Sequence, residues 1–589
     1  MPKKEKSNKE PEQKPNKKEL AKATDKTISN TPTPKVAKQS KIKWFSLLIL
    51  SLALAIIVID GTVLNVSQKY VINDLKTDVQ TIQWAFTSYS LVLAALTILG
   101  GRIGDLYGRK KMFILGAIIF AIGSVVTALS KDSFWLIGGW SIIEGIGAAL
   151  MVPASSALIV SNFEGKERGI AFGVYGATAG AASSFGPIIG GFFASTIGWR
   201  WAFGINVFIA ALLCVGSIVI KDSREFYPKK SYLDFRGAIL LAIGLTSIMY
   251  GIIQSSTYGW LLPKKEFNLN LIGISVTFWT ILFGLAVLVA FYRWEKSLEA
   301  KDKDPLFSLS IFRNRQFSVG IGTLTALFAG FSGLITYGVV FFLLTVRGLD
   351  ALGTGLALIP FSLATFIMAP LSSRFADKIG QKTLITIGLV INFIGGLMIY
   401  NAVDVKATEY NFIIPFLVTG VGFGLIAAQL NNVILSSVPT SEAGVASGIN
   451  GTIREIGRAF GISIIGAAFI SVLTTSAVAN INAQPSTVIS DRAKYAIVAT
   501  INKGDLAVGQ DPKTDDEVLA DAKKQGFYTE DPVVKKVYLS DFRKTERNIG
   551  IEFKKAITDA SKTTLLYTSA FTLLSIIIAQ FLINTKDKK

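Results

Sequence analysis

Two carboxylates, Asp60 and Glu144, lie inside long apolar stretches of the sequence. An ionisable group within such a stretch costs free energy, roughly several kcal/mol in a membrane, and therefore marks a functional candidate. Histidine is absent, so a proton bound near neutral pH must be held by carboxyl groups. We interpret Asp60 and Glu144 as groups that carry protons or attract a positive charge. The alternative is a structural hydrogen bond to a neighbouring helix.

The composition excludes several other kinds of chemistry. A single cysteine, Cys214, rules out a disulfide framework, and the lack of histidine removes imidazole catalysis and the common zinc sites. The sequence contains no Gly-x-x-x-x-Gly-Lys-Ser/Thr loop for nucleotide phosphates. We therefore predict no metal, no cofactor and no enzymatic activity. A membrane-embedded enzyme such as an acyltransferase is the weakest interpretation, because its usual His-Asp motif is missing.

Half of the residues are hydrophobic and only 17% are charged, against about a quarter in soluble proteins. Apolar segments of about 20 residues, long enough to cross a bilayer, recur from Trp44 almost to the C-terminus. Without water to satisfy the backbone, these segments must be helices, which predicts an all-α polytopic membrane protein. We place fourteen of them near 44–66, 81–101, 111–130, 134–161, 168–195, 199–220, 235–256, 270–293, 316–346, 351–371, 382–402, 411–437, 444–475 and 562–584.

The basic residues predict the orientation of these helices. Clusters of Lys and Arg occur in alternate connections, and the positive-inside rule places both termini in the cytoplasm. We expect a monomer in the plasma membrane with the lipid bilayer as its partner and no nucleic acid. The basic clusters are Arg102–Lys111, Lys166–Arg168, Lys221–Arg236, Arg293–Arg315, Arg374–Lys382 and Lys586–Lys589.

The chain divides into parts of different composition. The lysine-rich residues 1–43 lack the apolar surface needed to fold, so we predict a disordered basic cytoplasmic tail. Residues 476–561 are polar, and we predict an extracellular segment that is either a small hairpin or helical cap or a flexible loop. The predicted parts are the tail 1–43, an N-terminal six-helix half 44–220, two inserted helices 235–293, a C-terminal six-helix half 316–584 that includes 476–561, and a cytoplasmic C-terminus 585–589.

One loop motif occurs twice. Residues 101–110 (GRIGDLYGRK) follow the second apolar segment, and residues 373–382 (SRFADKIGQK) follow the tenth. The glycines permit close helix approach and a tight turn, the aspartate can bond a neighbouring helix end, and the basic residues anchor at the membrane surface. The candidate gating residues are Gly101, Asp105, Gly108, Arg109, Lys110 and Asp377.

These motifs resemble those of a known family. Residues 101–110 resemble the cytoplasmic loop of the major facilitator superfamily, and residues 59–66 (IDGTVLNV) resemble the first-helix motif of its fourteen-span drug:proton antiporters. The fifth segment resembles the antiporter motif of its drug exporters. The residues that carry this last resemblance are Gly176, Gly180, Gly186, Pro187, Gly190 and Gly191.

The resemblance implies two six-helix halves with two inserted helices. It also implies export of small amphipathic compounds, which we expect to be cationic, by proton antiport with alternating access. The alternative is a transporter of lipids or lipid-linked precursors with the same fold.

The fourth segment departs from the family pattern. The family usually has Arg-x-x-Gln-Gly there, whereas this chain has Ser141 and Glu144 in place of the Arg and the Gln. Without the Arg, desolvation favours the protonated form of a buried carboxyl group. We therefore expect Glu144 to be a proton-coupling site or a site for the substrate's charge that is peculiar to this chain. Further polar candidates for the wall of a central cavity are Asn65, Asn206, Gln254, Gln429, Asn432 and Arg454.

Overall fold

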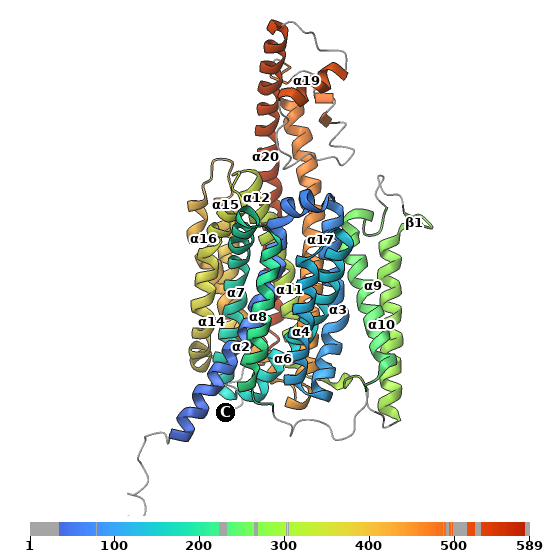
Figure 1. The fold of residues 1–589 in the computed structure, drawn as a ribbon, viewed down its shortest axis with the longest axis vertical. Helices are drawn as coiled ribbons and strands as arrows, with labels where there is room; N and C mark the ends of the chain where they lie inside the picture. The colour runs from blue at the N-terminus through green and yellow to red at the C-terminus, as the bar shows by residue number, and fades with distance from the viewer. Residues whose placement is uncertain are drawn as a thin grey trace, which may run out of the picture.

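A computed structural model of the protein describes residues 34–77, 79–222, 233–263, 269–301, 303, 305–486, 515–524 and 532–583, together with a few positions between 488 and 498. The predicted C-terminus 585–589 and most of the predicted tail lie outside these residues. The described chain is almost entirely helical, and its helices run side by side in one bundle (Figure 1).

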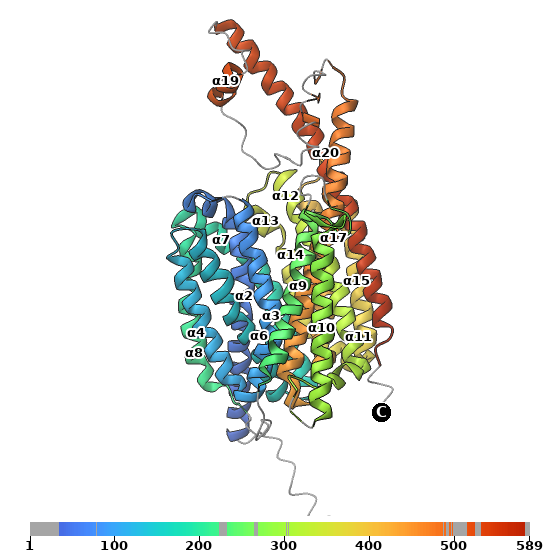
Figure 2. The same cartoon turned by 90° about the vertical axis from the view of Figure 1, so that its right-hand side faces the viewer.

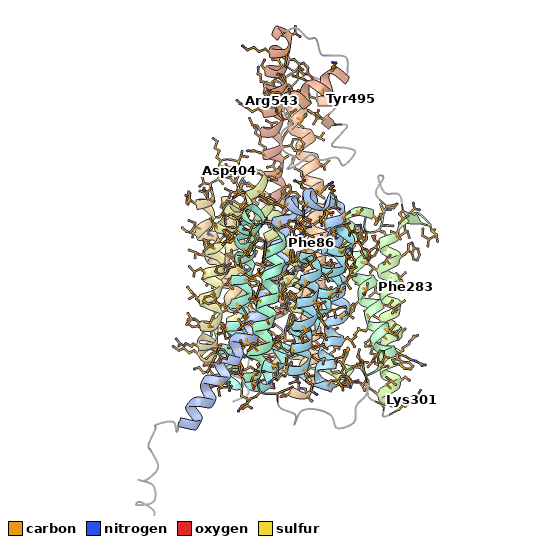
Figure 3. All side chains as sticks on the ribbon, viewed as in Figure 1. Phe86, Phe283, Lys301, Asp404, Tyr495 and Arg543 are labelled. Atoms are coloured by element: carbon orange, nitrogen blue, oxygen red, sulfur yellow. The ribbon has the colours of Figure 1, made fainter. Side chains whose placement is uncertain are left out.

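The bundle has two distinct ends. We call the end that holds the 102–111 loop the basic end, and the end from which two long helices project the arm end. Lys301 lies at the basic end and Asp404 at the arm end (Figure 3). The two ends correspond to the cytoplasmic and external sides in the predicted orientation.

The N-terminal half comprises the helices up to residue 219, and Glu144 is the last residue of a π-helix within it. Its helices are α2 (Pro34–Leu75), α3 (Val79–Tyr107), α4 (Arg109–Ala128), α5 (Ser133–Leu136), the π-helix Ile137–Glu144, α6 (Gly145–Asn162), α7 (Gly165–Thr196), α8 (Arg200–Gly216) and the 3-10 turn Ser217–Val219.

Two inserted helices, α9 (Phe235–Tyr258) and α10 (Val276–Ala300), follow this half. A two-stranded hairpin of β1 (Asn270–Leu271) and β2 (Ile274–Ser275) connects them. The predicted segment 270–293 was therefore placed too early, because its first residues form the hairpin and its helix continues to Ala300.

The C-terminal half begins with the 3-10 turn Leu309–Arg313 and contains a second π-helix. Its elements are α11 (Arg315–Gly333), the π-helix Leu334–Val340, α12 (Phe341–Thr345), α13 (Ala351–Ala357), α14 (Ile359–Ile379), α15 (Gln381–Ala402), the 3-10 turn Glu409–Phe412, α16 (Ile413–Ser436), the 3-10 turn Thr440–Glu442, α17 (Ala443–Ala483), α19 (Asp515–Lys524) and α20 (Pro532–Ala579).

Among the described residues, twelve helices are long and apolar enough to cross a membrane. The predicted number of fourteen requires two more, and α7 and α14 have the length for it, with 32 and 21 residues. They do not reach the same apolarity because α7 is rich in glycine, alanine and serine, and α14 ends in charged residues. Both helices pack against each other between the halves, where small residues allow close approach.

The inserted pair lies at one side of the bundle and contacts both halves (Figures 1 and 2). Trp84 of α3 stacks on Tyr250 of α9, with ring centroids 6.1 Å apart. Ser463 of α17 donates a hydrogen bond of 2.6 Å to the Ile252 carbonyl oxygen. Phe283 of α10 lies at the outer edge of the molecule (Figure 3), so α10 forms the periphery and α9 the contact.

Two boundaries differ from the predictions. Helix α2 begins at Pro34, so residues 34–43 continue the first helix rather than belonging to a disordered tail. Residues 476–483 and 532–561 belong to α17 and α20, which project past the bundle at the arm end (Figure 2). The described part of the segment 476–561 is thus largely helical, as in the helical-cap alternative.

Glycines bring α17 into backbone contact with its neighbours. A Cβ added at Gly461 would collide with the Ala329 carbonyl group of α11, and one at Gly457 would lie 2.6 Å from the Thr325 carbonyl oxygen. Gly550, on the projecting part of α20, has open space around it. The close packing of α17 on α11 therefore requires glycine, which has no side chain, at positions 457 and 461.

We expect Gly461→Val to destabilise the bundle, because α11 and α17 must separate to admit the side chain and core overpacking typically costs about 1–3 kcal/mol. Fluorescence-detected size-exclusion chromatography after heating should show a lower apparent melting temperature for this variant. Gly550→Val is the control and should leave it unchanged. An unchanged melting temperature for Gly461→Val would contradict the close packing.

Candidate functional site

The structure brings the two predicted carboxylates together in the N-terminal half. Asp60 of α2 accepts hydrogen bonds from Trp140 Nε1 at 2.6 Å and from Asn206 Nδ2 at 2.8 Å. The carboxyl group of Glu144 lies next to that of Asp60, close enough for the two groups to interact directly. We call Asp60 and Glu144 the carboxyl pair.

Glu144 has few polar contacts of its own. The Thr127 hydroxyl lies 3.3 Å from Glu144 Oε1 and 2.8 Å from the Gly123 carbonyl oxygen. Because this hydroxyl carries a single proton, it can donate to only one of them. The Ser124 hydroxyl and the Asp60 carboxyl group also lie close to Glu144, but Glu144 Oε2 meets no described residue in hydrogen-bond geometry.

An aromatic cover encloses the carboxyl pair. Trp140 stacks on Tyr89 with ring centroids 4.9 Å apart, and Phe86 packs edge-on against Trp140 at 5.1 Å. Asp60 is 1% exposed and Glu144 is 0% exposed. The pair therefore lies in a medium of low dielectric constant, where charge is costly unless it is matched.

The π-helix Ile137–Glu144 sets the direction of these side chains. It carries both Trp140 and Glu144, one turn apart, and Ser141 on the same turn donates to the Ala85 carbonyl oxygen at 2.8 Å. Single π turns within α-helices are rare and occur frequently at functional sites. Opposite them, Gly123 of α4 makes room for Glu144, because a Cβ there would lie 2.5 Å from Glu144 Cγ.

At the basic end, Asp105 joins the two halves. Its Oδ1 accepts from Arg109 Nε at 2.9 Å and Nη2 at 2.7 Å, and also from the Gly444 backbone N–H at 3.1 Å. Its Oδ2 accepts from the Val445 backbone N–H at 2.9 Å. Asp105 thus caps the N-terminus of α17, where the helix dipole favours a negative charge. We call this cluster the latch.

The other predicted residues of the 101–110 motif support the latch. Gly101 touches the Gly444 carbonyl group so closely that a Cβ would collide with it. Gly108 has φ +118° at the turn into α4, a backbone conformation that favours glycine. The backbone N–H of Lys110 donates to Asp222 at 3.1 Å.

The second copy of the motif makes a related contact on the opposite side. Asp377, at the end of α14, forms an ion pair of 2.7 Å with Lys166 at the start of α7. The two side chains are 44% and 60% exposed, so solvent screens this pair far more than it screens Asp105 and Arg109. Each copy therefore joins a helix of one half to the start of a helix in the other half. The contact of the first copy is the stronger one, because its ion pair is buried.

The glycines of α7 divide between two partners. A Cβ at Gly186 would collide with Thr62 of α2, and one at Gly190 would lie 3.0 Å from the Val63 Cα. Towards the basic end, a Cβ at Gly180 would lie 2.7 Å from Thr365 of α14, and Gly176 faces Ala427 of α16. Helix α7 therefore packs on α2 within its own half and on the other half at once.

Three charged residues of α17 form a second cluster, in the C-terminal half. Glu455 is buried and pairs with Arg458 at 2.8 Å, whereas Arg454 Nε is 3.9 Å from Glu455. The Arg454 guanidinium lies over the Phe328 ring, 5.8 Å from its centroid. Arg454 also lies near Tyr175 of α7, so this cluster faces the N-terminal half.

Of the other predicted cavity residues, only Asn206 joins the carboxyl pair. Gln429 donates to Ser372 Oγ at 3.0 Å, and Asn432 accepts from Ser436 at 3.0 Å, so both bond to helices of the C-terminal half. Gln254 lies on the inserted helix α9. Gly191 lies on α7, where its carbonyl oxygen accepts from Ser195. The side chains of Asn65 and Pro187 are outside the described part of the structure.

Sequence reasoning missed four side chains of these clusters: Tyr89, Trp140, Glu455 and Arg458. Trp140 had a usable signal, since it precedes Glu144 by four residues and shares its helix face. Glu455 lies inside the predicted segment 444–475, and so met the same criterion as Asp60. Tyr89 had no such signal, because aromatic residues are common in membrane helices.

A scan against protein-family models matches residues 50–290 and 267–462 to the Major Facilitator Superfamily. The chain belongs to the Major Facilitator Superfamily. It is a multi-pass membrane protein related to drug-resistance transporters. The latch in this superfamily member comes from the motif that suggested the family, and the match spans both copies of that motif.

Relatives of this superfamily member share most of its length. It is 30% identical to the probable actinorhodin transporter of Streptomyces coelicolor, with 75% of each chain covered. It is 27% identical to the multidrug resistance protein Stp of Mycobacterium tuberculosis and 28% identical to multidrug resistance protein 3 of Bacillus subtilis. These alignments cover 74% of this chain, with 78% and 81% of the two relatives.

A solved structure supports the fold. The crystal structure of the human organic anion transporter MFSD10 (TETRAN) superposes with a TM-score of 0.51 at 14% identity. The superposition covers 80% of this chain and 98% of MFSD10. At this identity the likeness concerns the arrangement of helices alone.

We expect Asp105→Asn to loosen the basic end, because it leaves the buried Arg109 without a carboxylate. Breaking a buried ion pair costs roughly 3–5 kcal/mol. Ile98 of α3 is buried against Gly448 of α17, so a cysteine there reports separation of the halves. In a Cys214→Ala background, a hydrophilic maleimide should label Ile98→Cys about tenfold faster once Asp105→Asn is added.

Asp377→Asn provides the comparison for this experiment. Its ion pair with Lys166 is exposed and should contribute only about 0–1 kcal/mol, so labelling should change less than about twofold. Equal acceleration by both substitutions would show that the buried capping contact is not what closes the basic end.

Proposed function

We propose that this protein is a secondary transporter that exports amphipathic compounds in exchange for protons, with the carboxyl pair as the proton carrier. The observation that supports this proposal is the enclosure of two adjacent carboxyl groups without a basic partner. No Lys or Arg side chain contacts Asp60 or Glu144 among the described residues. Two adjacent carboxylates in a dry site cannot both be ionised, so the pair holds a proton.

The hydrogen bonds indicate where that proton resides. Asp60 accepts from two donors, as suits a carboxylate. Glu144 faces the Thr127 hydroxyl, whose proton is directed at the nearer Gly123 carbonyl. This arrangement fits Asp60 as the anion and Glu144 as the protonated partner.

Alternating access supplies the coupling between proton and substrate. The latch and the α7–α14 contact hold the basic end closed. When these contacts break, the two halves can rotate relative to each other and open the basic end. The Trp140 side chain donates to Asp60 and is covered by Tyr89. Movement of the π-helix would therefore expose or enclose the carboxyl pair as the halves change position.

The remaining features of the proposal follow the predicted topology. We place the protein in the plasma membrane as a monomer with fourteen spans, counting α7 and α14, and with both termini in the cytoplasm. The basic end then faces the cytoplasm, and the arms of α17 and α20 face outward. In this orientation the loops around Arg102 and Arg374 lie on the side that the positive-inside rule requires.

A transporter of lipids is the second candidate. The supporting observation is an apolar groove of about 340 Å³ between α7 and α14, lined by residues such as Phe185, Leu363 and Phe366. These side chains are about half exposed on the outside of the bundle, where an acyl chain could lie. Transport of fluorescent lipids between vesicle leaflets, at a higher rate than that of drug-like dyes, would favour this candidate.

We expect Glu144→Gln to abolish proton-driven export while the protein stays folded in the membrane, because the amide can neither bind nor release a proton in this pH range. The measurement is dye transport by proteoliposomes under an imposed pH gradient. Glu552→Gln, at the base of the α20 arm, is the control, since Glu552 is another buried glutamate and forms an ion pair of 2.8 Å with Lys555. Full gradient-driven transport by Glu144→Gln would overturn the proposed proton carrier.

A further inference from the structure

Two guanidinium groups of the α17 cluster are accessible where this cluster faces the N-terminal half. Arg454 and Arg458 have side chains that are 29% and 45% exposed. In contrast, Asp60 and Glu144 are enclosed behind Trp140 and Tyr89. A substrate beside this cluster would therefore meet guanidinium groups before it could reach the carboxyl pair.

The α17 cluster carries an unbalanced positive charge. Two guanidinium groups share one carboxylate, that of Glu455, and the close contact of 2.8 Å belongs to Arg458. Arg454 lies 3.9 Å from the same carboxylate and makes no hydrogen bond to another described side chain. One guanidinium group thus retains its donors for an acceptor outside the cluster.

An aromatic platform lies beside Arg454. Its guanidinium is 5.8 Å from the centroid of Phe328, which contacts Phe423 at 6.2 Å. Phe423 in turn stacks on Phe331 with ring centroids 4.5 Å apart. Phe328 and Phe331 of α11 are partly exposed next to the charge, and the buried Phe423 of α16 supports them from behind.

A polar group from the other half completes the surroundings. Tyr175 of α7 is buried and lies near Arg454, and its hydroxyl, although close to Ser155 and Ser156, meets no described group in hydrogen-bond geometry. A buried hydroxyl without a partner is costly. An acidic group bound by Arg454 would offer this hydroxyl an acceptor.

We infer that Arg454, with Arg458 and Tyr175, forms a subsite for the acidic group of a flat amphipathic anion, whose rings lie on Phe328 and Phe331. This inference rests on the proposed transport function and specifies its substrate class. It replaces the cationic substrate that the sequence suggested. That expectation required Asp60 and Glu144 to face the substrate, whereas the structure encloses both.

Fluorescein and a rhodamine ester test the inference, because they share a three-ring skeleton and carry opposite charge at mildly alkaline pH. Binding is measured by fluorescence anisotropy with the purified full chain, without a pH gradient. We expect fluorescein to bind about tenfold more tightly than the rhodamine ester. Rhodamine binding of equal or higher affinity, or the absence of saturable fluorescein binding, would overturn the subsite.

Variants of the cluster give changes of opposite sign. Arg454→Gln should weaken fluorescein binding about tenfold, or about 1.4 kcal/mol, since the neutral amide replaces a charge-assisted hydrogen bond by a weaker one. Arg454→Lys keeps the charge and should lose about threefold or less. Glu455→Gln removes the competing carboxylate and should strengthen binding a few fold, a gain that misfolding cannot produce. Unchanged fluorescein affinity in the Arg454→Gln, Arg458→Gln double variant would also overturn the subsite.

The binding experiment is independent of proton coupling. If fluorescein binds selectively but its transport ignores a pH gradient, the proton antiport fails and the anion subsite stands. If a rhodamine ester is bound in preference and its transport follows the gradient, the antiport stands and the subsite is wrong.

Discussion

Helices α3 and α17 approach so closely at the basic end that no side chain fits between Gly101 and Gly444. This contact between the two halves depends on a buried charge. The N-terminus of α17 leaves backbone N–H groups unsatisfied, and Asp105 accepts from two of them while it also neutralises Arg109. Asp105 and Arg109 are buried, so water cannot replace these partners and the closed basic end depends on this one carboxylate.

The same need for close approach shapes the helices between the halves. Helix α7 approaches α14 through glycines such as Gly173 and Gly180, and its content of small residues lowers its apolarity compared with the peripheral helices. A helix that must slide or rock against another benefits from a flat surface of small side chains. The two helices that look least like membrane spans therefore lie where movement between the halves would take place.

The two charged clusters are placed differently with respect to solvent. The carboxyl pair is sealed by aromatic rings in the N-terminal half, whereas Arg454 and Arg458 are partly exposed in the C-terminal half. Enclosure in a medium of low dielectric constant strengthens the repulsion between two adjacent carboxylates, so the pair retains one proton. Partial exposure leaves a guanidinium group accessible to a ligand. A proton and a substrate can thus be held by different halves of one molecule.

The sequence alone determined the helices, because spanning length and the absence of water leave no other structure for long apolar segments. It also singled out Asp60, Glu144 and Asp105, since a charge in an apolar segment or a glycine-flanked loop is visible in the chain. Only the tertiary structure decided the partners of these residues. Asp60 meets Trp140 and Asn206 from distant helices, and Asp105 meets Gly444 in the other half. Helical periodicity does not fix the rotation of one helix against another, so the sequence could not show that the carboxylates are enclosed and the arginines exposed.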